Sequence, residues 1–374
     1  MRLDKLDLVR GVAALAVILG HLRAFLFVEH SAVANRNVVT DAFYGLTGFG
    51  HQAVVVFFVL SGFLIGGAVQ ERFATNRWSF GDYALRRMTR LWLVLLPALV
   101  LTLGWDLAGS ALSGGAGYDG RYYERNHSGP SSANPADNGA LAFLGNVLFL
   151  QTIVAPTYGT NGPLWSLANE FWYYLMFPLG FAACHRTTLV RVRVLCLVLL
   201  VAAGAFLPVG FLLAGLMWLA GYAAYVLAHS RFATLAASAL VFWGALLALA
   251  GVVFWNQWRG LSGADYWIAL AFSATLPRLA ADTGGTGWWR GPARYFGNTS
   301  YTLYLFHFPF LAFLSFGVFQ GRQWQPDAAG CTVYAGVVAL TLAGSHLAWW
   351  TFERRTEEVR RAVSGWFTAR RQPT

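Results

Sequence analysis

The chain has 374 residues, of which 57% are hydrophobic and only 12% are charged, about half the charged share of a typical soluble domain. This composition excludes a soluble globular protein and indicates a polytopic membrane protein. The net charge of +10 comes from arginines in loops and at span ends, so nucleic acid is not expected as a partner. The three cysteines, Cys184, Cys196 and Cys331, lack the spacing of a metal site or a disulfide framework, and no metal is expected.

Ten apolar runs are long enough to cross a bilayer, so we predict an all-α fold with about ten transmembrane helices. They cover roughly residues 7–27, 49–70, 90–112, 163–184, 190–206, 209–228, 232–254, 263–281, 298–319 and 331–352. The run 141–153 is too short, and we predict a re-entrant or interfacial helix there, within the polar stretch 113–162. No break in composition marks a soluble second domain, so residues 1–374 are predicted to form one integral-membrane domain.

The basic residues orient these spans. Those that would lie on the outer side are Arg23, Arg36, Arg121, Arg125, Arg259 and Arg322, and all other Lys and Arg residues, those near both termini included, would lie on the opposite side. The positive-inside rule therefore predicts cytoplasmic termini and an outer loop at 113–162. The tail after Phe352 is interpreted either as a basic amphipathic helix on the inner membrane surface or as a simple stop-transfer flank.

The first apolar run carries Arg10 and His21 inside a predicted span. They are eleven positions apart, which places them roughly 16 Å apart along a helix, about half the hydrocarbon thickness. An ionisable residue within a span costs about 3 kcal/mol on insertion scales. His21 is therefore either part of a functional site or a core histidine that hydrogen-bonds a neighbouring helix.

The fourth run contains one acidic residue well inside it, Glu170. Counted from the outer ends of their helices, Glu170 and His21 both lie roughly 10 Å below the outer surface. A carboxylate that accepts the second N–H of an imidazole fixes its tautomer and stabilises the imidazolium, so the other nitrogen can act as a general base. The alternative is an ion pair that only locks two helices together.

Two further stretches carry polar side chains. Ser61 lies in a stretch of small residues, which favours close helix packing over a nucleophilic role. Three arginines, Arg86, Arg87 and Arg90, open the third run on the cytoplasmic side. They are either topological anchors or, together with Arg10, forked ligands for phosphate.

His307 lies near the middle of the ninth run, close to Pro309. A proline inside a helix frees a backbone carbonyl and bends the helix. His307 is therefore either a donor that supports a catalytic side chain or a core residue. His346 has no such surroundings and is interpreted as core.

Together these residues resemble the integral-membrane acyltransferase-3 family. The matching pieces are Arg10 with His21, FFVLSGFLI at 57–65, RRMTRL at 86–91, LWSLANEFWYYLMFP at 164–178 and SYTLYLFHFP at 300–309. They span the chain from end to end in the order of the family. Members of this family transfer acyl groups, usually acetyl, from a coenzyme A thioester to hydroxyls of sugars, polysaccharides, peptidoglycan or macrolides.

The resemblance implies that His21 is the catalytic base and Glu170 its partner. It also implies that the phosphates of an acyl-CoA co-substrate are bound by Arg10, Arg86, Arg87 and Arg90. Residues expected to contact substrate or support the catalytic groups are Asn161, Trp165, Tyr174, Tyr301 and His307. The candidate oxyanion donors are Asn161, Asn169 and Trp165.

The expected function is transfer of an acetyl or other acyl group from cytoplasmic acyl-CoA to a hydroxyl of a carbohydrate or cell-envelope glycan. The acceptor is expected from the outer side of a bacterial inner membrane. Direct transfer and an acyl-enzyme intermediate on His21 both remain open. The alternative is a proton-coupled transporter or flippase of a glycan or lipid, but the sequence shows no obvious paired discontinuous helices in matching halves.

Overall fold

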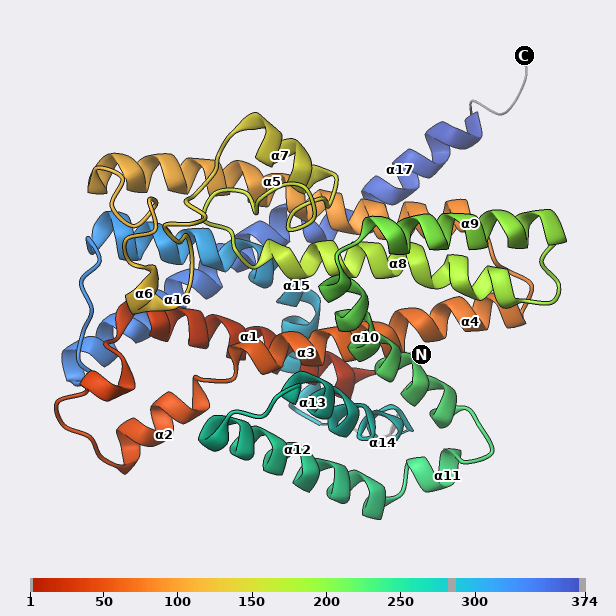
Figure 1. Ribbon diagram of the computed structural model, residues 1–374, viewed down its shortest axis with the longest axis horizontal. Helices are drawn as coiled ribbons and strands as arrows, with labels where there is room; N and C mark the ends of the chain where they lie inside the picture. The colour runs from red at the N-terminus through yellow and green to blue at the C-terminus, as the bar shows by residue number, and fades with distance from the viewer. Residues whose placement is uncertain (1–2, 282–286, 370–374) are drawn as a thin grey trace. The chain divides into compact units, whose positions relative to one another are not determined.

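The structure is a computed structural model that describes residues 3–281 and 287–369, without the side chains of Trp258 and residues 367–369. It is 76% helical, with no strand among the described residues, so the predicted all-α fold is confirmed (Figure 1). Arg2, Arg370 and Arg371, which the sequence places on the cytoplasmic side, lie outside the described residues.

The helices follow one another with short connections, except in the polar stretch 113–162. The first half contains α1 Asp4–Leu26, α2 Val38–Leu46, α3 Gly50–Ser61, α4 Gly67–Ala74, α5 Phe80–Ser113, α6 Tyr123–Asn126, α7 Ala140–Val147 and α8 Leu164–Cys184. The second half contains α9 Val190–Phe206, α10 Val209–Ala228, α11 Ala233–Ala236, α12 Ala239–Arg259, α13 Ala264–Ser273, α14 Leu276–Ala281, α15 Arg290–Ala312, α16 Ala328–Thr351 and α17 Thr356–Ala369. Two π-helical segments, η2 Gly62–Gly66 and η3 Phe313–Val318, and two 3-10 turns, η1 His30–Ala32 and η4 Glu353–Arg355, complete the list.

Seven helical stretches of the described chain are long and apolar enough to cross a membrane, so the predicted number of about ten is not confirmed. They are Asp4–Leu26, Val38–Ala74, Phe80–Ser113, Val209–Ala228, Ala239–Gln257, Arg290–Val318 and Ala328–Trp366. Three of the predicted runs do not qualify. The run 190–206 forms a helix of only 17 residues, and the run 263–281 is split into α13 and α14. The Trp, Tyr, Asn and Glu side chains of α8 lower its hydropathy.

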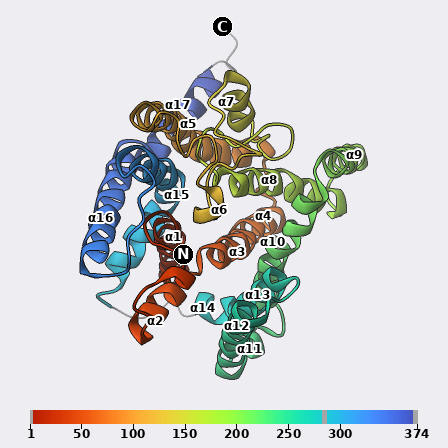
Figure 2. The same ribbon diagram turned by 60° about the vertical axis from the view of Figure 1, so that its left-hand side comes forward.

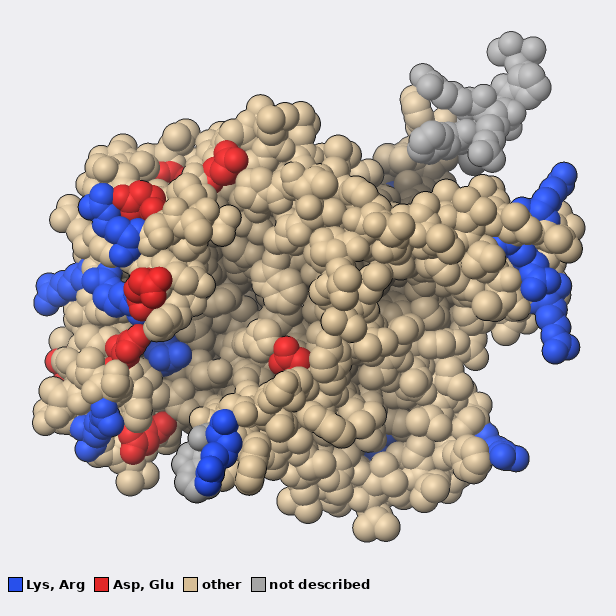
Figure 3. Space-filling view, viewed as in Figure 1, with Lys and Arg blue, Asp and Glu red and all other residues tan. Residues whose placement is uncertain are grey.

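The chain divides into two compact units. The first unit comprises the chain up to Ala13, His51–Trp78 and Asn169–Asn298, and the second comprises Ala14–Gly50, Ser79–Ala168 and the chain from Thr299 onward. Much of the surface drawn in Figure 3 carries no charged side chain, as expected for surface that meets lipid. The prediction of a single integral-membrane domain stays a prediction.

In the first unit, the segment α3–η2 crosses α10 at glycines (Figures 1 and 2). A Cβ on Gly62 would lie 1.8 Å from the carbonyl oxygen of Trp218, and one on Gly221 would lie 1.9 Å from the carbonyl oxygen of Val59. The two backbones therefore touch, which confirms the close packing predicted for the small residues around Ser61. Helices α12 and α13 lie side by side in both views and pack against each other.

In the second unit, the C-terminal half of α1 packs against α15 and α16, which run side by side (Figure 2). Their core is aromatic and aliphatic, and it consists of Leu22, Phe25, Leu26, Tyr118, Phe308, Leu311, Ala312, Phe316 and Val337. Segment η3 approaches α5 closely, since a Cβ on Gly317 would lie 2.8 Å from the Cα of Gly109. This core surrounds the part of α1 that carries His21.

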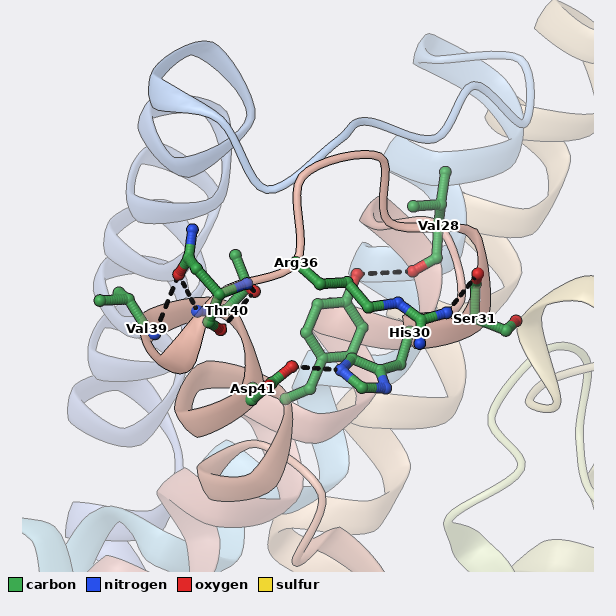
Figure 4. Close-up of polar contacts among 9 residues, drawn as sticks. Val28, His30, Ser31, Arg36, Val39, Thr40 and Asp41 are labelled. Atoms are coloured by element: carbon green, nitrogen blue, oxygen red, sulfur yellow. Dashed lines mark hydrogen bonds and ion pairs between the residues drawn. The ribbon is translucent and has the colours of Figure 1, made fainter.

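Polar contacts fix the segment that follows α1 (Figure 4). The His30 Nε2 lies 2.8 Å from Asp41 Oδ1, and Arg36 donates to the carbonyl oxygen of Ser31. The side chain of Asn37 caps α2 by accepting from the N–H groups of Val39 and Thr40. The chain therefore turns back toward α3 through a defined loop.

The stretch 113–162 folds around a buried carboxylate. Asp106 on α5 is 2% exposed and accepts hydrogen bonds from the backbone N–H of Thr160 (2.9 Å), the Thr160 hydroxyl (2.6 Å) and Asn138 Nδ2 (3.0 Å). The short helix predicted at 141–153 forms as α7, and its re-entrant or interfacial placement stays a prediction.

The glycine crossing generates a stability prediction. We expect Gly62→Ala to reduce the yield of monodisperse protein in detergent and to lower its apparent melting temperature by several degrees, because an added Cβ overlaps the Trp218 carbonyl; overpacking of this kind costs about 1–3 kcal/mol. The matched control is Gly244→Ala in α12, where a Cβ meets nothing within 4 Å. Equal melting temperatures for the two variants would contradict the close crossing.

Candidate functional site

His21 and His307 form a direct pair in the second unit. The Nδ1 of His21 lies 2.9 Å from the Nε2 of His307, and the two rings are nearly parallel with centroids 5.2 Å apart. The rings of His21 and Phe308 are nearly perpendicular, with centroids 4.9 Å apart. His307 is completely buried, so its contacts with the protein determine which of its nitrogens carries hydrogen.

The other nitrogen of His307 faces backbone carbonyls of its own helix. Its Nδ1 lies 2.8 Å from the carbonyl oxygen of Tyr304 and 3.1 Å from that of Leu303. Carbonyl oxygens only accept hydrogen bonds, so Nδ1 of His307 carries the hydrogen. In the neutral ring Nε2 is then an acceptor, and His21 must donate to it from Nδ1.

This assignment leaves the Nε2 of His21 with a free electron pair. A neutral imidazole in this tautomer can take a proton at Nε2 while its Nδ1–H stays hydrogen-bonded, which is the state required of a general base. The tautomer follows from the fixed acceptors of His307 and does not require a carboxylate. The Nδ1 of His21, for which a carboxylate partner, Glu170, is predicted from the sequence, contacts His307.

Pro309 explains how α15 is braced beside this pair. A proline has no N–H, so the carbonyl of Leu305, four residues earlier, loses its helical partner. The Nδ2 of Asn161 donates to that carbonyl (3.0 Å) and also to the hydroxyl oxygen of Thr102 (3.3 Å). The freed carbonyl predicted from the sequence is thus confirmed. Both amide hydrogens of Asn161 are engaged, which leaves none for an oxyanion.

Glu170 lies in the first unit, in a cluster of polar side chains on α8, α3 and α10. Its Oε1 accepts from the Ser61 hydroxyl (3.0 Å) and from the hydroxyl of Tyr174 by a short hydrogen bond. The indole N–H of Trp218 donates to the Ser61 oxygen (3.1 Å). Ser61 and Trp218 were not predicted as members of the site. The pairing of Glu170 with His21 stays a prediction.

The arginines of α5 have local partners. Arg86 forms a forked contact with Asp82. Its Nη2 donates to Oδ2 (2.7 Å), and its Nε lies 3.1 Å from both carboxylate oxygens. The Nη2 of Arg90 lies 3.6 Å from Glu353, and its guanidinium lies 5.9 Å from the ring centroid of Tyr301. A phosphate that binds here must share these guanidinium groups with Asp82 and Glu353.

The other predicted residues are also placed by local contacts. Arg87 lies 5.8 Å from the ring centroid of Tyr83, and Arg10 contacts Asp7 at 3.2 Å in the first unit. Trp165 is half-buried in the first turn of α8. Among the described residues, no group of three or more His, Cys, Asp or Glu side chains could hold a metal ion.

The comparisons with known proteins decide the family. The family model described as an acyltransferase domain, that of the acyltransferase-3 family, matches residues 3–350. The chain belongs to this family. Together with its long apolar helices, the membership indicates an integral membrane protein and does not support the transporter alternative.

One curated relative is the "Acyltransferase MdmB" of Streptomyces mycarofaciens, which is 29% identical over 181 residues. The alignment covers 48% of this chain and 40% of the relative. The match thus spans about two fifths of the length of that curated relative. No solved structure matches this acyltransferase-family chain significantly.

The histidine pair generates a prediction about acyl transfer. We expect His307→Leu to reduce turnover about tenfold or more, since His21 loses the acceptor that selects its tautomer. In His307→Gln the side-chain carbonyl can accept the same hydrogen bond, so turnover should recover in part. The measurement is transfer of labelled acetyl groups at equal amounts of folded protein. His346→Leu on α16 is the control, and equal turnover of His307→Leu and wild type would contradict the tautomer assignment.

Proposed function

We propose that this protein is a membrane O-acyltransferase that moves an acyl group, acetyl in the simplest case, from acyl-CoA to a hydroxyl of a carbohydrate or cell-envelope glycan. The observation that carries the proposal is the hydrogen bond from His21 to His307, because it leaves the Nε2 of His21 unprotonated. The acyltransferase family of the chain supports the same reaction class. A bacterial inner membrane with cytoplasmic termini is part of the proposal.

The reaction follows from this tautomer. The Nε2 of His21 removes the proton of the acceptor hydroxyl while the oxygen attacks the thioester carbonyl. The tetrahedral intermediate then expels the coenzyme A thiolate, which takes the proton back from His21. The acyl–oxygen bond replaces the acyl–sulfur bond, and His21 returns to its neutral form. Direct transfer of this kind requires no acyl-enzyme intermediate.

Glu170 supplies the negative charge that supports the positively charged His21 in this proposal. Its carboxylate is oriented by the hydroxyls of Ser61 and Tyr174. The proposal treats Glu170 and His21 as one functional unit, although His307 makes the direct contact at Nδ1 of His21.

The phosphates of the coenzyme are assigned to Arg10, Arg86, Arg87 and Arg90. Three of these arginines lie within the first three turns of α5, where they can present several guanidinium forks to one nucleotide. The carboxylates of Asp82 and Glu353 hold two of them in place. Phosphate must compete with these carboxylates, so donor binding is expected to weaken with ionic strength.

The proposed mechanism is tested by a double-mutant cycle. We expect His21→Ala and Glu170→Gln each to lower acetyl transfer about a hundredfold or more, and the double variant to lose little beyond the worse single. A matched control uses the exposed pair His51 and Asp265, whose Nε2 and Oδ2 atoms lie 2.8 Å apart. The variants His51→Ala and Asp265→Asn should keep wild-type turnover. Near-normal turnover in His21→Ala would contradict the mechanism. Strictly additive losses would contradict the coupling between His21 and Glu170.

The donor assignment has its own test. Arg87→Lys and Arg90→Lys keep the positive charge but lose the planar fork, so the apparent KM for acetyl-CoA should rise about tenfold while the protein still inserts. Arg77→Lys, in the loop before α5, is the control and should leave this KM unchanged. Wild-type kinetics in both α5 variants would leave these arginines only a topological role.

A further inference from the structure

We propose that Arg125 and Asn126 bind an anionic group of the acyl acceptor, which makes the acceptor an acidic saccharide. This inference rests on the proposed function, since it extends the substrate of the same reaction. It concerns only the second unit, where the C-terminal end of α1 meets two other segments.

Residues 323–324 run alongside the end of α1. The N–H of Trp324 donates to the carbonyl of Leu26 (2.7 Å), and the N–H of Val28 donates to the carbonyl of Trp324 (3.1 Å). Beside this pair, Nε2 of Gln323 donates both to the carbonyl of Ala24 and to Oδ1 of Asn126, each at 3.3 Å. Gln323 therefore links Asn126 to the last turns of α1.

Arg125, the preceding residue, is held between a ring and a backbone. Its guanidinium lies 4.5 Å from the ring centroid of Tyr122. On the other side is Gly321, with φ of +71°, where a Cβ would lie 2.9 Å from Nη2 of Arg125 and 2.6 Å from the Tyr122 ring. The position requires glycine, and the close approach fixes the guanidinium in one orientation.

The donors held in this way have no acceptor within the described chain. The Nδ2 of Asn126, whose side chain is 2% exposed, makes no hydrogen bond, and neither do Nε and Nη2 of Arg125. Unsatisfied buried donors cost about 1–3 kcal/mol each, and more when charged. Two carboxylates of the neighbouring loops have other partners, Glu29 with His127 at 2.7 Å and Asp119 with Arg121 at 2.6 Å.

These groups select an anion. A guanidinium and an amide NH2 offer hydrogen atoms and a positive charge, which is the complement of a carboxylate or a phosphate. A neutral hydroxyl could satisfy one donor but would leave the guanidinium charge unpaired. Both anions share this chemistry, and the experiment below distinguishes them.

The proposed anion site lies close to the part of α1 that carries His21. Gln323 contacts the carbonyl of Ala24, three residues after His21, which is roughly 5 Å along the helix. The segment that carries Arg125 continues to Gly129, where a Cβ would lie 3.8 Å from the ring of Phe308, and Phe308 in turn contacts His21. These two chains of contacts place His21 and the segment that carries Arg125 in one region of the second unit.

The experiment measures anion binding directly. Equilibrium dialysis of the purified full-length protein with labelled D-glucuronate and D-glucose compares ligands that differ at C6, where one carries a carboxylate. Wild type should bind glucuronate about tenfold or more tightly than glucose, the scale of one charge-assisted hydrogen bond. Inorganic phosphate serves as competitor. Displacement of glucuronate by phosphate admits both anions, and phosphate binding without glucuronate binding assigns the site to a phosphorylated sugar.

Four variants separate the alternatives. Arg125→Gln and the isosteric Asn126→Asp, which retains an acceptor for Gln323, should both abolish the preference for glucuronate. Arg121→Gln in the same loop should not change it. His21→Ala should keep glucuronate binding while it loses acyl transfer, so failure of the mechanism and failure of this site give different results. Equal affinity of wild type for glucuronate and glucose, without phosphate binding, overturns the proposal, as does wild-type binding in both Arg125→Gln and Asn126→Asp.

Discussion

The candidate chemistry of this protein depends on one constraint, the engagement of Nδ1 of His307 by the carbonyls of its own helix. Those carbonyls cannot donate, so they force His307 to accept from His21, and His21 in turn keeps a free electron pair on Nε2. The orientation of α15 therefore decides the chemical state of a residue on α1. A neutral pair achieves this without burying a charge, which is costly inside a membrane protein.

Several other features keep this constraint in place. Pro309 releases the carbonyl of Leu305, and Asn161 from the loop before α8 satisfies it. Asn161 is completely buried and also contacts Thr102 on α5. The helix that positions His307 is thus joined by polar contacts to two other parts of the second unit. In an apolar setting, such contacts specify how helices align where apolar packing alone leaves alternatives.

The sequence predicts the helical class, most long apolar stretches, the small-residue crossing and the carbonyl freed by Pro309, because each follows from local composition. It does not predict the partner of His21. The two histidines are 286 positions apart, and the expected depths favour Glu170 as the neighbour of His21, because His307 lies near the middle of its run. The contact of Arg86 with Asp82 could have been read from their spacing of four on one helix. The hydrogen bond from Trp218 to Ser61 could not have been predicted in this way, because the sequence does not show which acceptor an indole N–H will meet.

Asp106 has a consequence for the biosynthesis of the protein. Its hydrogen-bond donors, Asn138 and Thr160, follow it by 32 and 54 residues, so α5 leaves the ribosome with a carboxylate that nothing yet satisfies. The carboxylate lies close to the C-terminal end of α5, where contact with water lowers the cost of insertion. Once the loop has folded onto α5, its residues remove that carboxylate from water. The stretch that contains Arg125 and Asn126 follows α5 directly, and its far end is hydrogen-bonded to α5 only after translation has passed Thr160.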